Sequence, residues 1–202
     1  MKKITPEHPI LMSARLLLRP FSLNDVIEVS HLVGEYEVAE PLMAVSYPYS
    51  EDDALRWITN HSPSYETNGS LNFAVELCEN KTLVGFIGMG GNNDQAGMGY
   101  WYGKAFWGNG YATEAGCVIL AFGFEELELQ RVEASHLSKN EASGRVLCKI
   151  GMRTIGRRPH YYRKWSKYCQ KDEYAITKAD YIEAYAKSSV NYSYQRVSSL
   201  PS

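Results

Sequence analysis

The sequence predicts one α+β domain, in which helices cover a mostly antiparallel sheet. Three runs with strand-like character, 71–77, 83–89 and 98–102, follow one another with short turns between them, which favours a meander. A glycine-rich bend at 107–112 then leads into an apolar segment, 115–124, that is typical of a buried helix. A chain of 202 residues, 45% of them hydrophobic, is long enough to enclose one sizeable core.

Composition narrows the class of protein. A net charge of −2 provides no basic field for nucleic acid. The four cysteines, Cys78, Cys117, Cys148 and Cys169, are widely spaced and form no Cys-x-x-Cys pair, which favours free thiols in a reduced compartment over disulfides or a metal site. Charges and prolines interrupt the first twenty residues, and no long apolar run follows. We therefore expect a cytoplasmic protein that is neither exported nor inserted in a membrane, with no metal.

The first part of the chain alternates short elements with loops. We expect an irregular lead over 1–13, a first strand over 15–21, and a helix that is capped by Ser22 or Asn24 and extends to Leu32. A loop follows at 41–48. A second helix then begins after Ser50, whose next three residues are acidic and suit a helix N-terminus. Residues 62–70 are polar, contain Pro63 and Gly69, and are predicted to be a loop.

After the meander and the apolar helix, the pattern returns to strands. We expect a strand over 129–137 and a helix over 140–150 that stops at Gly151. A final hairpin would pair 154–162 with 172–178 across a loop at 163–171. The domain would thus cover 14–185, and the polar segment 186–202 is expected to be a flexible tail.

The bend at 107–112 has the properties of an anion site. A strand, a glycine-rich bend and a helix in that order leave backbone N–H groups unpaired at the helix start. Gly108 and Gly110 carry no side chain, so a phosphate can approach the backbone closely. The bend is not a dinucleotide fingerprint, because Thr113 stands where a third glycine would be needed. Taken alone, it could also be an ordinary turn.

Four motifs together resemble one enzyme family. Trp107-Gly-Asn-Gly-Tyr-Ala112 is similar to the pyrophosphate loop of the GCN5-related N-acetyltransferases (GNAT), with Trp107 where Gln or Arg is usual. Three further stretches resemble motifs of its RimJ/RimL-like branch, the ribosomal-protein N-terminal acetyltransferases. They are Arg15-Leu-x-Leu-Arg-Pro20, Gly99-Tyr-Trp101, and Asn140-Glu-Ala-Ser143 followed by Lys149-Ile-Gly-Met152. The similarity covers residues 14–180.

The resemblance implies a fold, a cofactor and a reaction. The fold would be a twisted, mixed sheet that splays between its fourth and fifth strands and holds acetyl-CoA (CoA) in the gap. An amine would attack the thioester directly. The backbone of Tyr102 would stabilise the oxyanion, and Asn140 would contact the pantetheine arm. The cofactor's phosphates would lie on the residues of the bend and the helix start: Trp107, Gly108, Asn109, Gly110, Tyr111, Ala112 and Thr113.

The proton-transfer groups stay open at this point. The resemblance places Ser143 near the cofactor sulfur, and the position of the tyrosine acid of many relatives is Cys148 here, so the acid is Ser143, Cys148 or water. Gly97 stands where many relatives have a glutamate that acts as the general base. The alternatives for the base here are Glu114, the strand residues Glu133 and His136, or a chain of water molecules. A structural role is equally consistent with Glu114, since a carboxylate favours a helix N-terminus, and Asn140 suits an ordinary N-cap.

Aromatic residues that flank the mouth in such folds are candidates for acceptor binding: Tyr49, Trp57, Tyr100 and Tyr161. The acceptor would be a primary amine, with a protein N-terminal α-amine, such as that of a ribosomal protein, as the first choice. A small-molecule amine (a polyamine, an amino acid analogue or an aminoglycoside) and a non-catalytic CoA-binding regulatory module are the alternatives. The sequence leaves open whether the protein is a monomer or a homodimer.

Overall fold

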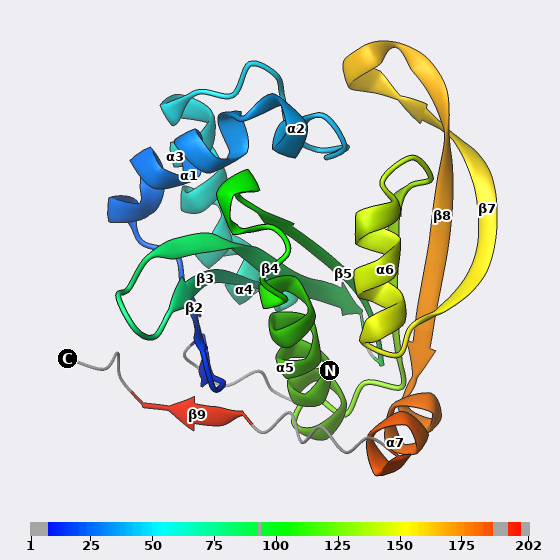
Figure 1. Ribbon diagram of the computed structural model, residues 1–202. Coiled ribbons are helices and arrows are strands. Elements are labelled where there is room, and N and C mark those ends of the chain that lie inside the picture. Colours follow the sequence, from blue (N-terminus) through cyan, green and yellow to red (C-terminus); the bar gives the residue numbers. More distant parts are fainter. Residues whose placement is uncertain (1–7, 93, 188–193, 199–202) are drawn as a thin grey trace.

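A mixed sheet of nine strands organises the computed structural model, which describes residues 8–92, 94–187 and 194–198 (Figure 1). The strand order is β7-β8-β6-β5-β4-β3-β2-β1-β9. In chain order the elements are β1 Ile10–Met12, β2 Leu16–Pro20, α1 Val26–Gly34, α2 Tyr36–Ala39, α3 Glu51–Thr59, α4 His61–Asn68, β3 Leu71–Leu77, β4 Leu83–Asn92, β5 Gln95–Tyr102, α5 Tyr111–Glu125, β6 Arg131–Leu137, α6 Glu141–Lys149, β7 Arg153–Tyr162, β8 Lys167–Thr177, α7 Lys178–Lys187 and β9 Gln195–Val197.

One strand pair is parallel, and it is short. β5 and β6 pair at Gln95 with Arg131, Ala96 with Val132, and Gly97 with Glu133, whereas every other neighbouring pair of strands is antiparallel. Beyond Gly97 the two strands have no register with each other in the described residues. The predicted α+β class is therefore confirmed, together with a sheet that splays between the strands predicted at 98–102 and 129–137. We call the space between the diverging ends of β5 and β6 the opening.

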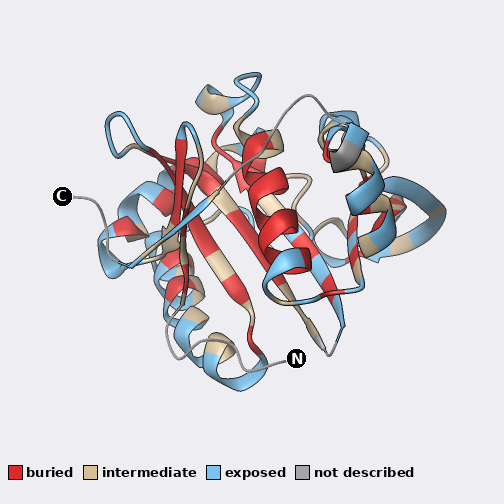
Figure 2. Cartoon of the chain, turned by 90° about the horizontal axis from the view of Figure 1, so that it is seen from below, coloured by how far each residue is buried: buried red, intermediate tan, exposed pale blue. Residues whose placement is uncertain are grey.

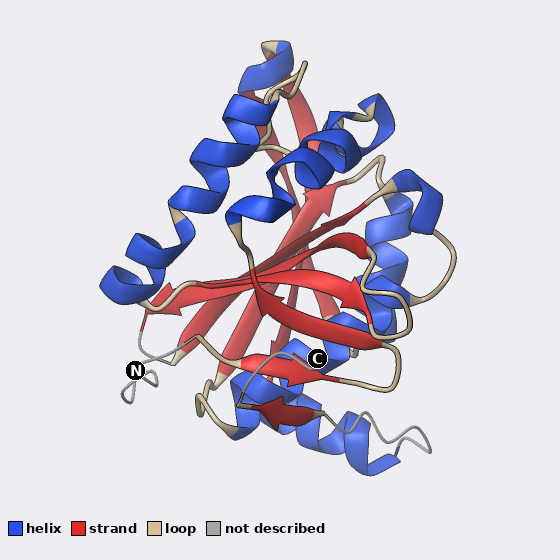
Figure 3. Ribbon diagram, turned by 90° about the vertical axis from the view of Figure 1, so that its left-hand side faces the viewer, coloured by secondary structure: helices blue, strands red, loops and turns tan. Residues whose placement is uncertain are grey.

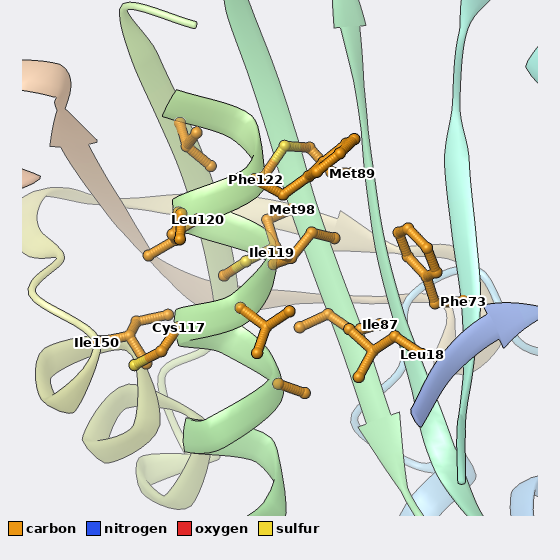
Figure 4. Packing of buried hydrophobic residues seen from close by; sticks show 14 of the residues in the cluster. Leu18, Phe73, Ile87, Met89, Met98, Cys117, Ile119, Leu120, Phe122 and Ile150 are labelled. Atoms are coloured by element: carbon orange, nitrogen blue, oxygen red, sulfur yellow. The ribbon is translucent and has the colours of Figure 1, made fainter. Parts of the chain in front are cut away.

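Helix α5 covers one face of the sheet. Its residues from Glu114 to Phe124 are all buried (Figure 2), because the helix is apolar nearly all round and packs against the sheet and against α6. Ile119 and Phe122 point at Ile87 and Met89 of β4, and Cys117 lies beside Ile150 at the end of α6 (Figure 4). Burying each such aliphatic or aromatic side chain contributes about 1.5–3 kcal/mol, so this layer holds the domain together.

Helices α1 and α3 cover the opposite face, so the sheet is enclosed from both sides (Figure 3). An aromatic cluster joins them to the strands. Trp57 of α3 lies with its ring centroid 5.0 Å from that of Phe21 and 5.1 Å from that of Phe86, in edge-to-face geometry. Trp101 of β5 is buried in the same cluster. Because neighbouring strand residues face opposite sides, Trp101 marks the α1–α3 face of β5, and Met98 and Tyr102 mark the α5 face.

The predicted helix starts and glycine stops are found in place. Ser22 and Ser50 form capping boxes with Asp25 and Asp53, each three residues further on. The helix expected after Ser22 begins as one turn of 3-10 helix before α1. Gly151 has φ +90° directly after α6, as expected of a glycine at a helix C-terminus.

Residues 62–70 are not a loop, so that prediction is wrong. They form helix α4 up to Asn68, and the two residues that indicated a loop fit the helix ends. Pro63 is the third helical residue, in the first turn, where a backbone N–H has no partner inside the helix. Gly69 ends the helix with φ 72°. Both residues therefore delimit this helix instead of excluding it.

Both ends of the chain differ from the predicted irregular lead and flexible tail. β1 lies within 1–13, β9 lies within 186–202, and the two strands pair through Leu11 and Arg196. Helix α7 also continues to Lys187. Strands of three residues are too short to show a period, which is why the sequence did not reveal them. Residues 1–7, 188–193 and 199–202 of the predicted lead and tail lie outside the described residues.

Two strands are longer than the sequence predicted. Gly90 and Gly91, expected in a turn, continue β4, and β8 begins at Lys167, so the connection to β7 is much shorter than the predicted loop. Within the described ranges, none of the helices combines the length and apolar character that a membrane span requires.

A buried ion network fixes β2 against α1 and β3. The Arg19 guanidinium donates to both oxygens of Asp25, at 2.8 Å each, and through Nε to Glu76 at 2.7 Å. All three side chains are largely buried, with 9–12% exposed. Burial alone would raise the pKa of Asp25, but the hydrogen bonds from Arg19 and Ser22 outweigh burial, and the pKa lies below its ordinary value.

Replacing Arg19 by Met is expected to lower the free energy of unfolding by about 3–5 kcal/mol, because two buried carboxylates lose their partner. Urea denaturation at pH 7 measures the change. Arg56→Met is the matched control. It removes an exposed pair with Asp53 and should leave the midpoint almost unchanged.

The same network should make the stability difference between wild type and Arg19→Met depend on pH. The folded-state pKa of Asp25 is lowered, so its stabilisation is present above the ordinary carboxyl pKa of about 4 and is lost as the pH falls through the folded value. The gap between wild type and Arg19→Met should therefore narrow on acidification. A gap that stays constant down to pH 3 would contradict this account.

Candidate active site

The opening between β5 and β6 exposes backbone groups of β5. Gly103 donates its backbone N–H to Val84 of β4 at 3.0 Å. Successive residues of a strand direct their backbone groups to opposite sides, so the N–H and C=O of Tyr102 face the opening. The Tyr102 carbonyl accepts a hydrogen bond from the Trp107 indole at 2.7 Å. The N–H of Tyr102 is thus directed to the place where the resemblance implies an oxyanion donor.

The bend that follows β5 leads into the start of α5. Gly108 and Gly110 have φ +81° and +80°, which only glycine adopts without strain. The first hydrogen bond of the helix runs from Glu114 N–H to Gly110 O at 3.0 Å. The N–H groups of Tyr111, Ala112 and Thr113 precede it, so they have no partner within the helix and lie at its positive end.

This bend fits a diphosphate. A Cβ atom built on Gly108 would meet no atom within 4 Å, so the space above that residue is free. Asn109 closes the bend from within by donating its side-chain N–H groups to Phe106 O at 3.1 Å and Trp107 O at 3.3 Å. The free N–H groups and the open space are compatible with the anion site that the sequence predicts, and anion binding at this bend stays a prediction.

Arg15 and Glu114 hold the bend in place. Glu114 Oε2 accepts from Arg15 Nε at 2.7 Å, and Glu114 Oε1 accepts from Ser13 Oγ at 2.8 Å and from Arg15 N–H at 3.0 Å. Arg15 Nη1 donates to Asn109 O at 3.1 Å, and its guanidinium lies 4.9 Å from the centre of the Tyr111 ring. Both oxygens of the Glu114 carboxylate are engaged. These contacts favour the structural role of Glu114 over the catalytic one.

Tyr100 and Ser143 meet across the opening. The Tyr100 hydroxyl lies 2.8 Å from Ser143 Oγ and donates to Ser143 O at 3.1 Å. Burial raises the pKa of Tyr100 to about 12, so its hydroxyl remains protonated at neutral pH. Asn140 is the N-cap of α6, and its Oδ1 accepts from Ser143 N–H at 3.3 Å. The cap orients the first turn of α6, and the pair of hydroxyls can pass a proton toward the opening.

The side chain of Tyr102 carries a buried hydroxyl group under α5. This hydroxyl finds no hydrogen-bond partner among the residues that the structure describes. Burial, with Tyr100 and Glu114 nearby, raises the pKa of this phenol well above its ordinary value. A buried hydroxyl without a partner is costly, which a bound polar group would relieve.

His136 and Tyr174 lie behind α6. His136 Nδ1 is 2.8 Å from Leu137 O, and its Nε2 is 3.4 Å from the Tyr174 hydroxyl. A Cβ atom on Gly144 would come within 2.8 Å of His136 Nε2, so only glycine lets α6 pack this closely. His136 is therefore enclosed on the α5–α6 side of the sheet, and these contacts favour a structural role.

A cavity of about 500 Å³ lies where the strand pairing ends. Its lining includes Gly97 and Gly99 of β5 and Glu133 and Ser135 of β6. Val132 and Ala134 belong to the core under α5, so by alternation Glu133 and Ser135 face the other side of the sheet. Gly97 and Gly99 share the face of Trp101 for the same reason. The cavity thus reaches the base of the opening from the face that α5 leaves free.

The outer wall of the cavity is charged. Glu173 of β8 accepts from Arg158 of β7 at 2.6 Å and from Lys171 at 3.1 Å through the same oxygen. Hydrogen bonds from Lys171 and Arg158, the Lys171 one being the largest effect, keep the pKa of Glu173 below its ordinary value. Glu173 is therefore ionised at neutral pH, and the wall presents both signs of charge.

The predicted acceptor residues are not brought together. Tyr100 lies at the opening, whereas Tyr49 and Trp57 pack against the core under α1 and α3. Trp57 reaches the cavity only through Phe86, which it contacts and which lines the cavity. Tyr161 is 46% exposed on the β7–β8 hairpin, with its ring centroid 5.3 Å from that of Tyr168. Cys148 is exposed on α6 and has no contact with the Ser143–Tyr100 pair.

Sequence reasoning missed the anchoring of the bend by Arg15 and the role of the β5 glycines. Arg15 belongs to a motif of the first strand, but 99 residues separate it from Glu114, and no local pattern links them. The alternation of Gly97, Gly99 and the tyrosines of β5 was a usable signal. It predicts a strand face without side chains, which is where the cavity lies.

Comparisons with known proteins agree with this geometry. A model of the acetyltransferase (GNAT) domain matches residues 15–153. The uncharacterized N-acetyltransferase YoaA of Bacillus subtilis is 28% identical over 174 residues, which covers 84% of this chain and 97% of YoaA. A solved GNAT-family acetyltransferase from Bacillus anthracis has a TM-score of 0.75 at 25% identity, over 84% of this chain and 99% of that one. Mycobacterium smegmatis RimJ, in complex with CoA-disulfide, has a TM-score of 0.73 at 22% identity, over 88% and 97%.

The chain therefore belongs to the GNAT family of acetyltransferases, and it is an acetyl-CoA-dependent N-acetyltransferase. The family resemblance read from the sequence is confirmed, and the likeness to RimJ extends it at the level of the fold.

Replacing Gly110 by Glu is expected to weaken CoA binding by at least roughly 100-fold, since it puts bulk and a negative charge where free N–H groups favour an anion. Isothermal titration calorimetry with CoA measures the effect. Gly110→Asn is the matched control, because asparagine tolerates the positive φ of +80° and adds no charge. Equal CoA affinity of the two variants would show that the diphosphate lies elsewhere.

Proposed function

We propose that this enzyme transfers the acetyl group to a primary amine, most often the α-amine at a protein N-terminus. The observation that carries the proposal is an opening in the sheet that is reached from two faces. The anion site of α5 lies on one side, and a separate polar cavity reaches the base of the opening from the other. Two reactants can thus approach each other from opposite directions, which suits direct attack without a covalent enzyme intermediate.

Acetyl-CoA supplies the activated acetyl thioester. The chain's own residues bind and orient it. The N–H groups of Tyr111, Ala112 and Thr113 would hold the diphosphate, and the Tyr102 N–H would donate to the developing oxyanion. The cap formed by Asn140 fixes the start of α6, which bears Ser143.

Ser143 is the proposed proton donor to the departing sulfur, with Tyr100 as its partner. The two hydroxyls lie 2.8 Å apart, so a proton given up by Ser143 can be replaced from Tyr100. Cys148 remains without such a partner among the described residues, which favours Ser143 over Cys148 as the acid.

The charge of the cavity supports a peptide terminus over a polycation. Among its lining residues, the carboxylates Glu133 and Glu173 are balanced by Arg158 and Lys171. A site for a polyamine would be expected to carry an excess of negative charge.

A panel of amines tests the proposal through thiol release from acetyl-CoA. It contains tetrapeptide amides that begin with Ser, Ala or Met, the same peptides with blocked N-termini, spermidine, lysine amide and an aminoglycoside. We expect turnover of the free peptides and none of the blocked ones. Faster turnover of a small amine would change the acceptor class. Tight CoA binding without turnover of any amine would instead favour a regulatory module.

Ser143→Ala is expected to lower kcat by roughly 100-fold and to leave CoA affinity almost unchanged, because the hydroxyl moves a proton and does not hold the cofactor. Tyr100→Phe should lower kcat less, and the double variant should be no slower than Ser143→Ala, since both hydroxyls act as one unit. Tyr168→Phe, which changes an exposed tyrosine, is the control. Full activity of Ser143→Ala would exclude the donor role.

A further inference from the structure

We infer that Glu133 attracts the ammonium group of the acceptor into the cavity and takes its proton through water. The inference rests on the proposed function and names the general base that the proposal leaves open. It arises from the placement of one carboxylate at the base of the opening, on the face where the cavity lies.

The position of Glu133 follows from the strand register. Glu133 is the last residue of β6 that pairs with β5, opposite Gly97. The strands diverge directly after this pair. Because Val132 and Ala134 face the core under α5, the side chain of Glu133 is directed to the opposite face, and it lines the cavity. The carboxylate is therefore placed at the base of the opening, and Tyr102 lies five residues, or about 16 Å, further along β5.

No side chain of β5 separates the carboxylate from the opening. A Cβ atom on Gly99 would have no neighbour within 4 Å, and one on Gly97 would approach only the carbonyl oxygen of Gly90, at 3.7 Å. Since neither glycine has a positive φ, the backbone itself does not require glycine at these positions. Their missing side chains instead leave an open path along the face of β5.

One oxygen of the Glu133 carboxylate accepts a hydrogen bond, and the other accepts none among the described residues. Arg131 Nε donates to Glu133 Oε1 at 2.8 Å, and among the described residues Oε2 has no hydrogen-bond partner. The side chain is 52% exposed, so an incoming ammonium group can reach it. The charged groups that face Glu133 are Arg131 on its own strand, Lys171 and Glu173 on β8, and Arg158 on β7.

The other acidic and basic groups near the opening are engaged elsewhere. Glu173 is paired with two cations through one oxygen, and its lowered pKa makes it a weak base. Glu114 is bound to Arg15 and Ser13 at the start of α5. His136 faces α6 on the other side of the sheet. Of the two carboxylates that line the cavity, Glu133 lies at the β5–β6 junction and binds one cation, whereas Glu173 lies on β8 and binds two.

The transfer then balances as follows. The ammonium group gives one proton through water to Glu133, and the neutral nitrogen forms its bond to the thioester carbonyl carbon. The carbon–sulfur bond breaks, and its electron pair leaves with the sulfur, which receives a proton from Ser143. The nitrogen loses its second proton to solvent, and Glu133 also releases its proton to solvent. Ser143 is reprotonated by Tyr100, which regains a proton from solvent. The products are the acetamide, the free thiol and one proton in solution.

Glu133→Gln separates this role from a structural one through its pH profile. With Glu133 present, kcat/KM for a peptide α-amine should be flat from about pH 6 up to the amine pKa of about 8. The variant can use only the neutral amine, so its kcat/KM should fall tenfold for each pH unit below about 8. The loss near pH 7 should be roughly 100-fold and should shrink as the pH rises.

The measurement uses the full chain, acetyl-CoA and the amine of the panel that the wild type acetylates fastest. Glu141→Gln is the matched control, since Glu141 is an 83% exposed glutamate on α6 outside the cavity. CoA affinity, by calorimetry, should be unchanged in both variants. Glu133→Asp provides a second test should Glu133→Gln fold poorly. It keeps the carboxylate, so it should keep the flat profile at a reduced rate.

Parallel pH profiles of wild type and Glu133→Gln would overturn this inference and leave the proposed function intact. An Asp variant that follows the steep profile of the Gln variant would also overturn it. A wild type that binds CoA but acetylates none of the amines would overturn the proposed function, and the inference with it.

Discussion

The brief parallel pairing of β5 with β6 is the constraint on which the site depends. It joins the two halves of the sheet through only three residue pairs, so the rest of both inner edges lacks strand partners. Unpaired backbone groups need other partners, and the chain provides some of them. The Trp107 indole N–H donates to the Tyr102 carbonyl of β5, and the Tyr100 hydroxyl donates to the Ser143 carbonyl of α6. The N–H groups that remain are the ones that a ligand can use.

The packing of α5 and α6 keeps the strands apart. Gly116 of α5 lets Ile150, which ends α6, approach so closely that an added Cβ atom would lie 3.1 Å from its side chain. Each helix is in turn attached to its own side of the opening. Glu114 ties α5 to the β1–β2 turn through Arg15, and Asn140 caps α6 after β6. Closing the strands would require both attachments to give way, which explains why the gap is part of the ground-state fold.

What the sequence could predict was local. Ser50 and its acidic neighbours, Gly151 and the glycines of the bend each dictate a conformation within a few residues, and each was found as expected. Pairings over long distances carry no such signal. The contact of Arg15 with Glu114 spans 99 residues, and β1 meets β9 from opposite ends of the chain. The motif Gly99-Tyr-Trp101 located the site strand, but only the register of β6 shows that Glu133 faces the cavity.

The pairing of β1 with β9 has a practical consequence for handling the enzyme. Residues near both ends of the described chain, Ile10 and Val197, lie side by side at one margin of the sheet. In the strand order, β4, β3, β2 and β1 lie between β5 and β9, which at about 4.8 Å for each strand step corresponds to roughly 24 Å. A tether attached to an exposed residue of β9, such as Gln195, would therefore hold the protein on a resin or sensor chip by the margin remote from the opening, leaving the entrance for the amine unobstructed.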